Sequence, residues 1–280
     1  MSQAAFSYQR ATSIDDALAA IAGGKAKVLA GGMSLLPLMK LRLASPERLV
    51  DIGRLSELRA LGPTPDGGLQ IGALATYADI LEATTLPIAV QCISDIGDVQ
   101  VRNRGTVGGA ISHADPASDL PALGLALDYS AVLRSSRGER TVPLDGFFTG
   151  TFATAMAPDE LLVRVIRGPL PAGAGGSYQK LKNPASGYSI VGVAAVVAMS
   201  GGSVSHVRAA LTGVGEVAYR AKEVEAALLG SDGSPDAVTA AAAHATVGQV
   251  VNGDIHADRA YRASMAVVYT RRAIEAALGR

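Results

Sequence analysis

A pair of glycines between a short apolar strand and an apolar helix is the most constraining feature of this 280-residue chain. Residues 28–30 are predicted to form a strand, Gly31 and Gly32 interrupt it, and residues 35–43 are predicted to be helical. Glycine lets backbone N–H groups approach a ligand with no Cβ in the way, and a helix N-terminus suits phosphate. Residues 30–40, called loop one below, are therefore a candidate phosphate site, although an ordinary strand–helix turn also explains them.

A second glycine pair opens residues 106–119, called segment two below. Gly108 and Gly109 precede a dense run of small polar residues, namely Ser112, His113, Asp115, Ser118 and Asp119. Such a run between apolar segments is costly to bury unless a ligand or the backbone satisfies it. A metal site is a weaker alternative, because no second histidine lies at ligand spacing. The pattern predicts a loop over residues 101–122.

The rest of the chain alternates predicted strands, helices and turns. The turn-rich stretches at 63–68 and 168–176 are candidate boundaries. Capping-box spacings at Ser13 and Thr76 predict helix starts. Strands are expected at 49–52, 69–73 and 161–166, hairpins around 135–138 and 201–202, and helices at 14–21, from 77, at 88–96 and from 221 onward.

One further glycine pattern resembles a dinucleotide fingerprint. Residues 213–218 read G-x-G-x-x-A, which binds pyrophosphate when it follows the first strand of a parallel unit. The preceding residues, 204–211, fit the second arm of an antiparallel hairpin better. We therefore expect a structural connection here.

Composition excludes several classes of protein. Lys plus Arg equals Asp plus Glu at 25 each, and there is no tryptophan, so nothing favours nucleic acid. Cys92 is the only cysteine, which excludes an all-cysteine iron–sulfur site in this chain. The first residues show no signal peptide, and no apolar run reaches the ~20 residues of a membrane span. A cytoplasmic protein is expected.

The sequence contains few motifs that are typical of a catalytic site. There is no G-x-S-x-G motif, and the four histidines form no recognisable constellation. Phosphate-binding backbone without acid–base or nucleophilic groups suits a carrier whose cofactor supplies the chemistry.

Four blocks of sequence together resemble the medium, FAD-binding subunits of molybdenum hydroxylases, the group of carbon monoxide dehydrogenase, xanthine dehydrogenase and quinoline oxidoreductase. The blocks are AGGMSLLPLMKLRLASPERLVDIGRL (30–55), VRNRGTVGGAISHADPASDLPAL (101–123), FFTGTFATAMAPDELLVRVIRGP (147–169) and YQKLKNPASGYSIVGVAA (178–195). The resemblance implies an α+β fold of the vanillyl-alcohol-oxidase (PCMH) type. Two FAD-binding α/β subdomains, residues 1–62 and 63–170, would precede a C-terminal domain, residues 171–280, of antiparallel sheet and helices.

The same resemblance implies which residues lie beside FAD. Ile96 and Val101 would border the cofactor, Leu161 and Leu162 would lie near the flavin ring, and Lys180 and Tyr188 would lie close to it. Loop one and segment two would hold the pyrophosphate and ribityl parts through Lys27, Val28, Leu29, Ala30, Gly31, Gly32, Met33, Ser34 and Leu35, and through Thr106, Gly108, Gly109, Ala110, Ser112, Asp115 and Asp119. No catalytic residue and no metal ligand is expected.

The resemblance further implies a heterotrimer, commonly doubled. A small subunit with two [2Fe–2S] clusters would deliver electrons to FAD on this chain, and a large molybdenum-cofactor subunit would oxidise the substrate. Two alternatives stay open: a stand-alone FAD-dependent oxidase or reductase with its own substrate site, and a scaffold that has lost its flavin.

Overall fold

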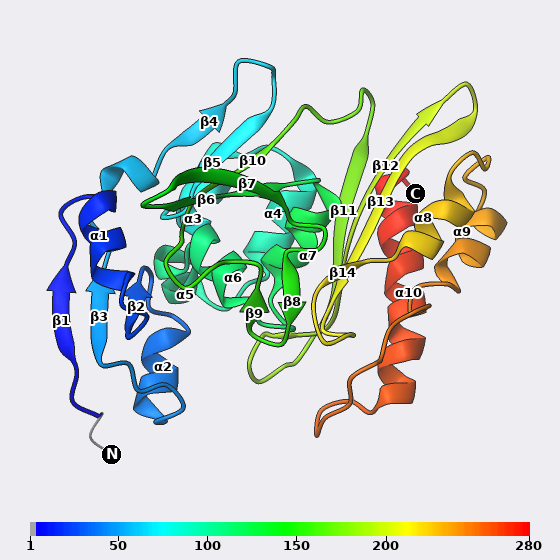
Figure 1. The fold of residues 1–280 in the computed structure, drawn as a ribbon. Coiled ribbons are helices and arrows are strands. Elements are labelled where there is room, and N and C mark those ends of the chain that lie inside the picture. Colours follow the sequence, from blue (N-terminus) through cyan, green and yellow to red (C-terminus); the bar gives the residue numbers. More distant parts are fainter. Residues whose placement is uncertain (1–3) are drawn as a thin grey trace.

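Three main sheets and one two-stranded sheet form the computed structural model, which describes residues 4–280, and the main sheets follow one another along the chain (Figure 1). Residues 1–3 of the predicted first subdomain lie outside this part. The first sheet is parallel and the other two are antiparallel. The expected α+β class is confirmed by this architecture.

The N-terminal sheet is small and has the order β1-β3-β2. Its elements are β1 (Ser7–Arg10), α1 (Ile14–Ile21), β2 (Ala26–Leu29), α2 (Leu35–Lys40), β3 (Arg48–Asp51) and the 3-10 turn η1 (Ser56–Leu58). Helix α1 begins where Ser13 accepts a hydrogen bond from the Asp16 N–H, and its apolar face packs on Val50. Helix α2 ends at Lys40, three residues before the predicted end at 43, because the chain turns back there.

The middle sheet has the order β4-β5-β10-β6-β7. Its strands are β4 (Leu61–Pro63), β5 (Leu69–Gly72), β6 (Ser130–Ser135), β7 (Gly138–Pro143) and β10 (Leu161–Arg167), and β8 (Phe148–Gly150) pairs separately with β9 (Ala153–Thr154). The predicted hairpin around residues 135–138 is confirmed by the β6–β7 register. One face of this sheet packs against helices α3 (Tyr77–Ala83) and α4 (Pro87–Ser94) and against the helices described next.

The predicted loop over 101–122 is wrong. The segment contains most of α5 (Val99–Arg104), all of α6 (Val107–His113) and the start of α7 (Asp119–Ala126). Asp98 caps α5 and Thr106 caps α6 by accepting hydrogen bonds from backbone N–H groups. Every residue of α7 is buried. Short helices with glycines carry little sequence signal, and burial stabilises them here.

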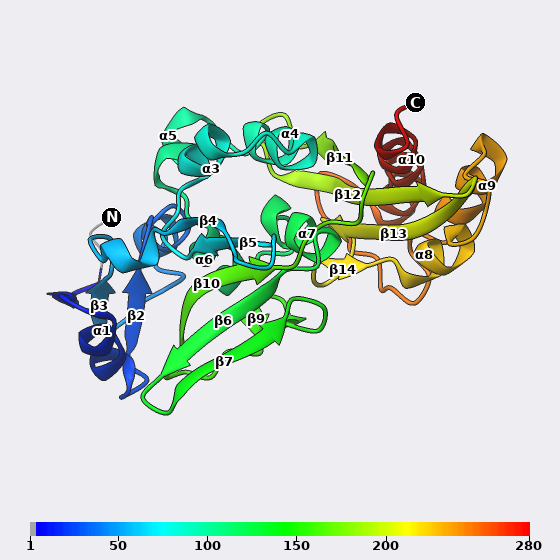
Figure 2. The same ribbon diagram turned by 90° about the horizontal axis from the view of Figure 1, so that it is seen from above.

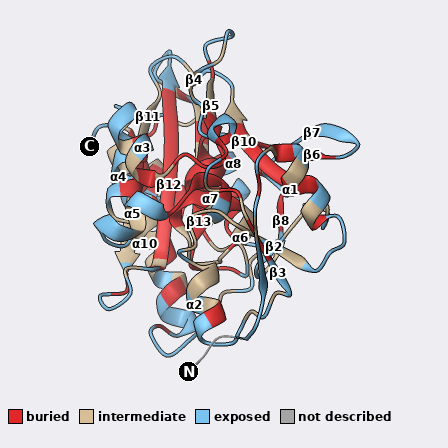
Figure 3. Ribbon diagram, turned by 90° about the vertical axis from the view of Figure 1, so that its left-hand side faces the viewer, coloured by how far each residue is buried: buried red, intermediate tan, exposed pale blue. Residues whose placement is uncertain are grey.

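The C-terminal sheet, in the order β11-β12-β13-β14, is covered on both faces (Figure 2). Its elements are β11 (Gly175–Lys182), β12 (Ser189–Ser200), β13 (Ser203–Thr212), β14 (Tyr219–Arg220), α8 (Lys222–Leu228), α9 (Pro235–Ala242) and α10 (Arg259–Ala277). Helix α10 lies on one face, and α4 and α7 lie on the other. The centre of β12 is buried, as expected for a strand whose sheet has helices on both faces (Figure 3).

The β12–β13 hairpin confirms the prediction for residues 191–211 and explains the dinucleotide-like glycines. Gly213 ends β13 with a φ of +80°, and an added Cβ would lie 2.6 Å from the Ile190 carbonyl oxygen. A structural connection therefore accounts for this glycine.

The three predicted domains correspond roughly to the three main sheets. Strand β4 straddles the predicted boundary at 62–63, and the domain division stays a prediction. Within residues 4–280, no helix has the length and apolarity that crossing a bilayer requires.

The capping box of α3 provides a test of these local interactions. Thr76 Oγ1 accepts from the Asp79 N–H at 3.1 Å, and the Asp79 carboxylate accepts from the Thr76 N–H at 2.8 Å. Thr76→Ala should lower the free energy of unfolding by about 1 kcal/mol, measured by urea denaturation. Thr85→Ala, at an exposed threonine without a hydrogen bond to the described residues, should stay within about 0.5 kcal/mol. Equal losses in both variants would contradict the capping role.

Candidate functional site

Loop one presents a row of unpaired backbone donors. Gly32 has a φ of +78°, a left-handed conformation that favours glycine. The N–H groups of five successive residues, Gly31 to Leu35, have no hydrogen-bond acceptor among residues 4–280. The Leu36 N–H, which follows them, closes the first helical turn on the Gly32 carbonyl at 3.1 Å. Successive N–H groups around a left-handed residue form a concave anion site, called the cradle below.

The cradle lies directly against the corner between α5 and α6. A Cβ added to Gly31 would lie 1.9 Å from the Arg104 carbonyl oxygen and 3.3 Å from Gly105 Cα. No side chain can occupy that space without moving backbone. Gly31 therefore lets the N-terminal subdomain approach the start of segment two closely enough to share one site.

The donors at the start of segment two are already used within the protein. The N–H groups of Val107 and Gly108 donate to the carbonyls of Ala75 and Ala73, and the Gly109 N–H donates to Thr106 Oγ1 at 3.1 Å. The structure gives Gly108 a packing role, because a Cβ added there would lie 2.5 Å from the Cβ of Ala73. Gly109 is exposed, and an added Cβ there would meet only Thr106 Oγ1, at 2.8 Å. Residues 107–109 of segment two therefore add no free N–H group to those of loop one.

Side chains from several segments approach one another at the end of α6. The His113 ring packs on Phe152 with centroids 5.0 Å apart. Burial lowers the pKa of His113, and the nearby Lys27 adds to this, whereas Asp115 opposes it. Burial raises the pKa of Tyr188, and the nearby Asp115 carboxylate adds to this. Strand β2, segment two, the β8–β9 turn and the turn before β12 thus border one region.

Asp119 lies at the centre of a buried polar network. Its carboxylate accepts from Lys180 Nζ at 2.9 Å, Tyr178 Oη at 2.5 Å and Ser189 Oγ at 2.6 Å. The Lys180 ammonium also donates to the Asp95 carbonyl at 3.1 Å, and only 2% of its side chain is exposed. Burial raises the pKa of Asp119, and the Lys180 charge opposes this. The network joins α7 to β11 and β12 behind Tyr188.

This network changes the interpretation of two predicted cofactor residues. Both Asp119 oxygens and the Lys180 ammonium are already bound by protein groups, so these side chains position the site's walls. Sequence reasoning missed Tyr178 and Ser189. Tyr178 could have been found, because alternation along a strand puts it on the same face as Lys180.

The other predicted residues have varied environments. Ile96 and Val101 are half-buried, near the turn before β12, where Gly187 approaches Gly97. Leu161 and Leu162 begin β10 with side chains in the core, which leaves only backbone atoms for a ligand. Tyr188 is 47% exposed. The remaining predicted residues are half-buried along β2 and α6, except for the exposed Lys27 and Met33 and the buried Thr106. They comprise Lys27, Val28, Leu29, Ala30, Met33, Ser34, Leu35, Thr106, Ala110, Ser112 and Asp115.

Comparison with known proteins identifies the group bound by chains with this site. Residues 4–171 match the family described as "FAD binding domain in molybdopterin dehydrogenase", and residues 176–277 match "CO dehydrogenase flavoprotein C-terminal domain". This chain belongs to the FAD-binding medium subunits of molybdenum hydroxylases. The predicted family and cofactor are thereby confirmed, and the unpaired donors of the cradle suit the diphosphate of FAD.

Relatives of this medium subunit match it over nearly its full length. The carbon monoxide dehydrogenase medium chain of Hydrogenophaga pseudoflava is 40% identical over 98% of both chains. The glyceraldehyde dehydrogenase medium chain of Sulfolobus acidocaldarius is 40% identical over 83% of this chain and 84% of its own. A solved carbon monoxide dehydrogenase from Hydrogenophaga pseudoflava superposes with a TM-score of 0.95 and 41% identity, covering 100% of this chain and 99% of that one.

Two left-handed glycines provide a matched test of the cradle. Gly32→Ala should weaken FAD binding at least about tenfold, the effect of losing one strong hydrogen bond, because alanine disfavours the backbone that aligns the donors. Gly24 has a φ of +71° with nothing within 4 Å of an added Cβ. Gly24→Ala should cause a similar loss of stability and leave FAD affinity unchanged. Flavin fluorescence titration distinguishes these outcomes, and equal FAD affinity in both variants would contradict the cradle.

The Asp119–Lys180 pair predicts a pH-dependent stability effect. Lys180→Met should lower the free energy of unfolding by roughly 3–5 kcal/mol at pH 8, because it leaves a buried carboxylate unpaired. The variant raises the folded-state pKa of Asp119 further. Stability from an acid with a raised folded pKa is full below its unfolded pKa and is lost as pH rises through the folded value. The deficit should therefore shrink toward pH 5.

Controls separate this effect from general loss of charge. Adding Asp119→Asn to Lys180→Met should remove the pH dependence of the deficit. Lys182→Met, at an exposed lysine paired with Asp95, should cost less than about 1 kcal/mol. A pH-independent deficit in Lys180→Met would show that Asp119 carries no charge in the wild-type network.

Proposed function

We propose that this chain is the electron-transfer subunit of a heterotrimeric molybdenum hydroxylase. The row of unpaired N–H groups in the cradle is the observation that carries the proposal, because such a row suits a diphosphate and this chain is a member of an FAD-binding family. When bound, FAD would accept electrons from [2Fe–2S] clusters on a partner and pass them to an external acceptor.

The chain's own residues would bind and enclose the cofactor. We propose that Gly31 to Leu35 donate hydrogen bonds to the pyrophosphate. Segment two, with Ser112 and Asp115, would accept from sugar or ribityl hydroxyls. Tyr188 would border the flavin ring from the turn before β12, where the ring of a half-exposed tyrosine is accessible to a ligand. The Asp119 network would keep this turn in place.

Substrate oxidation would belong to another subunit. Among residues 4–280, no three His, Cys, Asp or Glu side chains gather as metal ligands, and the His113 ring packs on Phe152. Relatives at 40% identity are named for different dehydrogenases, one of carbon monoxide and one of glyceraldehyde. Their names as medium chains support partners of two other sizes. We infer a small iron–sulfur subunit and a large molybdenum subunit, assembled with this chain as a dimer of heterotrimers.

Reconstitution tests the division of labour. The isolated chain loaded with FAD should be bleached by dithionite and should regain its absorbance when an acceptor such as ferricyanide is added. It should show no turnover with purines, aldehydes, N-heterocycles or carbon monoxide until small and large subunits are added. Flavin reduction by one of these substrates with the isolated chain would contradict the proposal and favour a stand-alone oxidase.

A further inference from the structure

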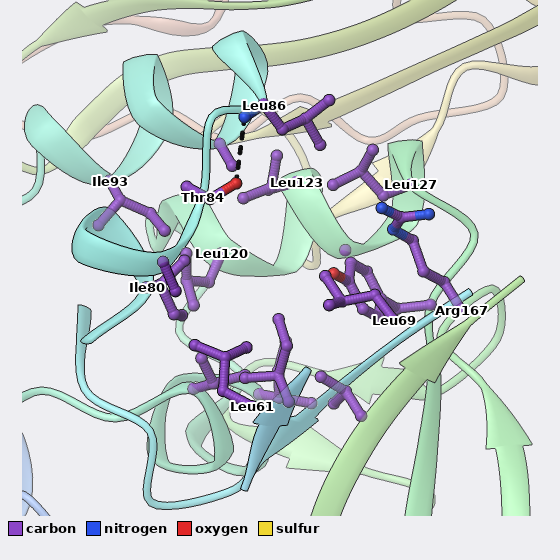
Figure 4. Close-up of a pocket in the computed structure, with 18 of the residues that line it drawn as sticks. Leu61, Leu69, Ile80, Thr84, Leu86, Ile93, Leu120, Leu123, Leu127 and Arg167 are labelled. Atoms are coloured by element: carbon purple, nitrogen blue, oxygen red, sulfur yellow. Dashed lines mark hydrogen bonds between the residues drawn. The ribbon is translucent and has the colours of Figure 1, made fainter. Parts of the chain in front are cut away.

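An apolar cavity of about 270 Å³ lies inside the middle subdomain (Figure 4). Leu61, Leu69 and Val165 line it from the sheet, and helices α3, α4, α6 and α7 close the other side with residues such as Ile80, Ile93 and Leu123. An engineered cavity of ~150 Å³ admits benzene, so this one has room for a larger apolar molecule.

The cavity is separate from the proposed FAD site. None of the predicted cofactor residues lines it. Helices α6 and α7 are shared walls: Ile111 and Leu120 face the cavity, whereas Ser112 and Asp119 belong to segment two. FAD bound at the cradle therefore leaves the cavity's occupancy unexplained.

Arg167 supplies the single charge in the cavity's lining. Its Nε atom is buried and has no hydrogen-bond partner, and its Nη1 donates only to the adjacent Gly168 carbonyl at 2.9 Å. No carboxylate among the described residues forms an ion pair with it. Arg164, on the same strand, is by contrast paired with Glu139 at 2.8 Å.

Tyr129 adds a second polar group beside Arg167. It lines the cavity and is 7% exposed. Burial raises the pKa of Tyr129, and the charge of the nearby Arg167 guanidinium opposes this. A protonated phenol can donate a hydrogen bond. The Tyr129 hydroxyl and the Arg167 guanidinium are therefore both available as donors to a ligand in the cavity.

We propose that this cavity binds an apolar monocarboxylate. The carboxylate would accept from Arg167 and Tyr129, and the hydrocarbon part would lie among the leucines. A buried donor without a partner calls for an acceptor, and a cation without a counterion favours an anion over a neutral carbonyl. An apolar pocket with a few convergent polar groups is the usual form of a small-molecule site.

Calorimetric titration of the FAD-loaded chain with decanoate, and with decanol as its uncharged counterpart, tests the proposal. Decanoate should bind more tightly than decanol. Arg167→Gln should weaken decanoate at least about tenfold and leave decanol unchanged. Arg164→Gln, the matched control on the same strand, should change neither affinity. Leu69→Trp, which fills the cavity, should abolish binding of both.

Flavin content reports folding in every variant and keeps this test independent of the proposed electron-transfer function. No binding of decanoate to the wild type would overturn the proposal, as would equal losses in the two arginine variants. Tighter binding of decanol, or of a neutral quinone such as decylubiquinone, would replace the carboxylate with an uncharged ligand and also overturn it.

Discussion

The contact between Gly31 and the Arg104 carbonyl is the constraint on which the site depends. It brings a loop of the first sheet against the α5–α6 corner of the middle subdomain with no side chain between them. The unpaired donors of loop one then face segment two across a short distance. A larger residue at position 31 would push loop one away from the α5–α6 corner. This would disrupt the site even if the new side chain did not touch the ligand.

Sequence reasoning found the elements whose signal is local. Helix α1, the capping box of α3 and both antiparallel hairpins follow from side chains close in the chain, and the structure contains them. The strand and the helix that flank the glycine pair of loop one were also predicted, because their signals are local. The loop predicted at 101–122 failed because α6 and α7 depend on burial between two sheets.

Roles that depend on distant partners were harder to predict. Asp119 looked like a ligand acceptor from its polar surroundings, but Tyr178 and Lys180, about sixty residues later, occupy its oxygens. Gly108 and Gly109 looked alike, and only the position of Ala73 distinguishes them. The family resemblance supplied the cofactor and the assembly, which no residue pattern in this chain could have established alone.

The proposed phosphate site consists of main-chain donors, and this has an evolutionary consequence. Substitution of Met33, Ser34 or Leu35 alters a side chain and leaves the N–H groups in place, provided that the backbone keeps its course. These positions are therefore free to drift between lineages, and selection can adjust their side chains to each complex without disturbing how the cofactor is held. Gly31 and Gly32 lack this freedom. Gly31 has no room for a side chain beside the Arg104 carbonyl, and Gly32 adopts a left-handed φ that favours glycine.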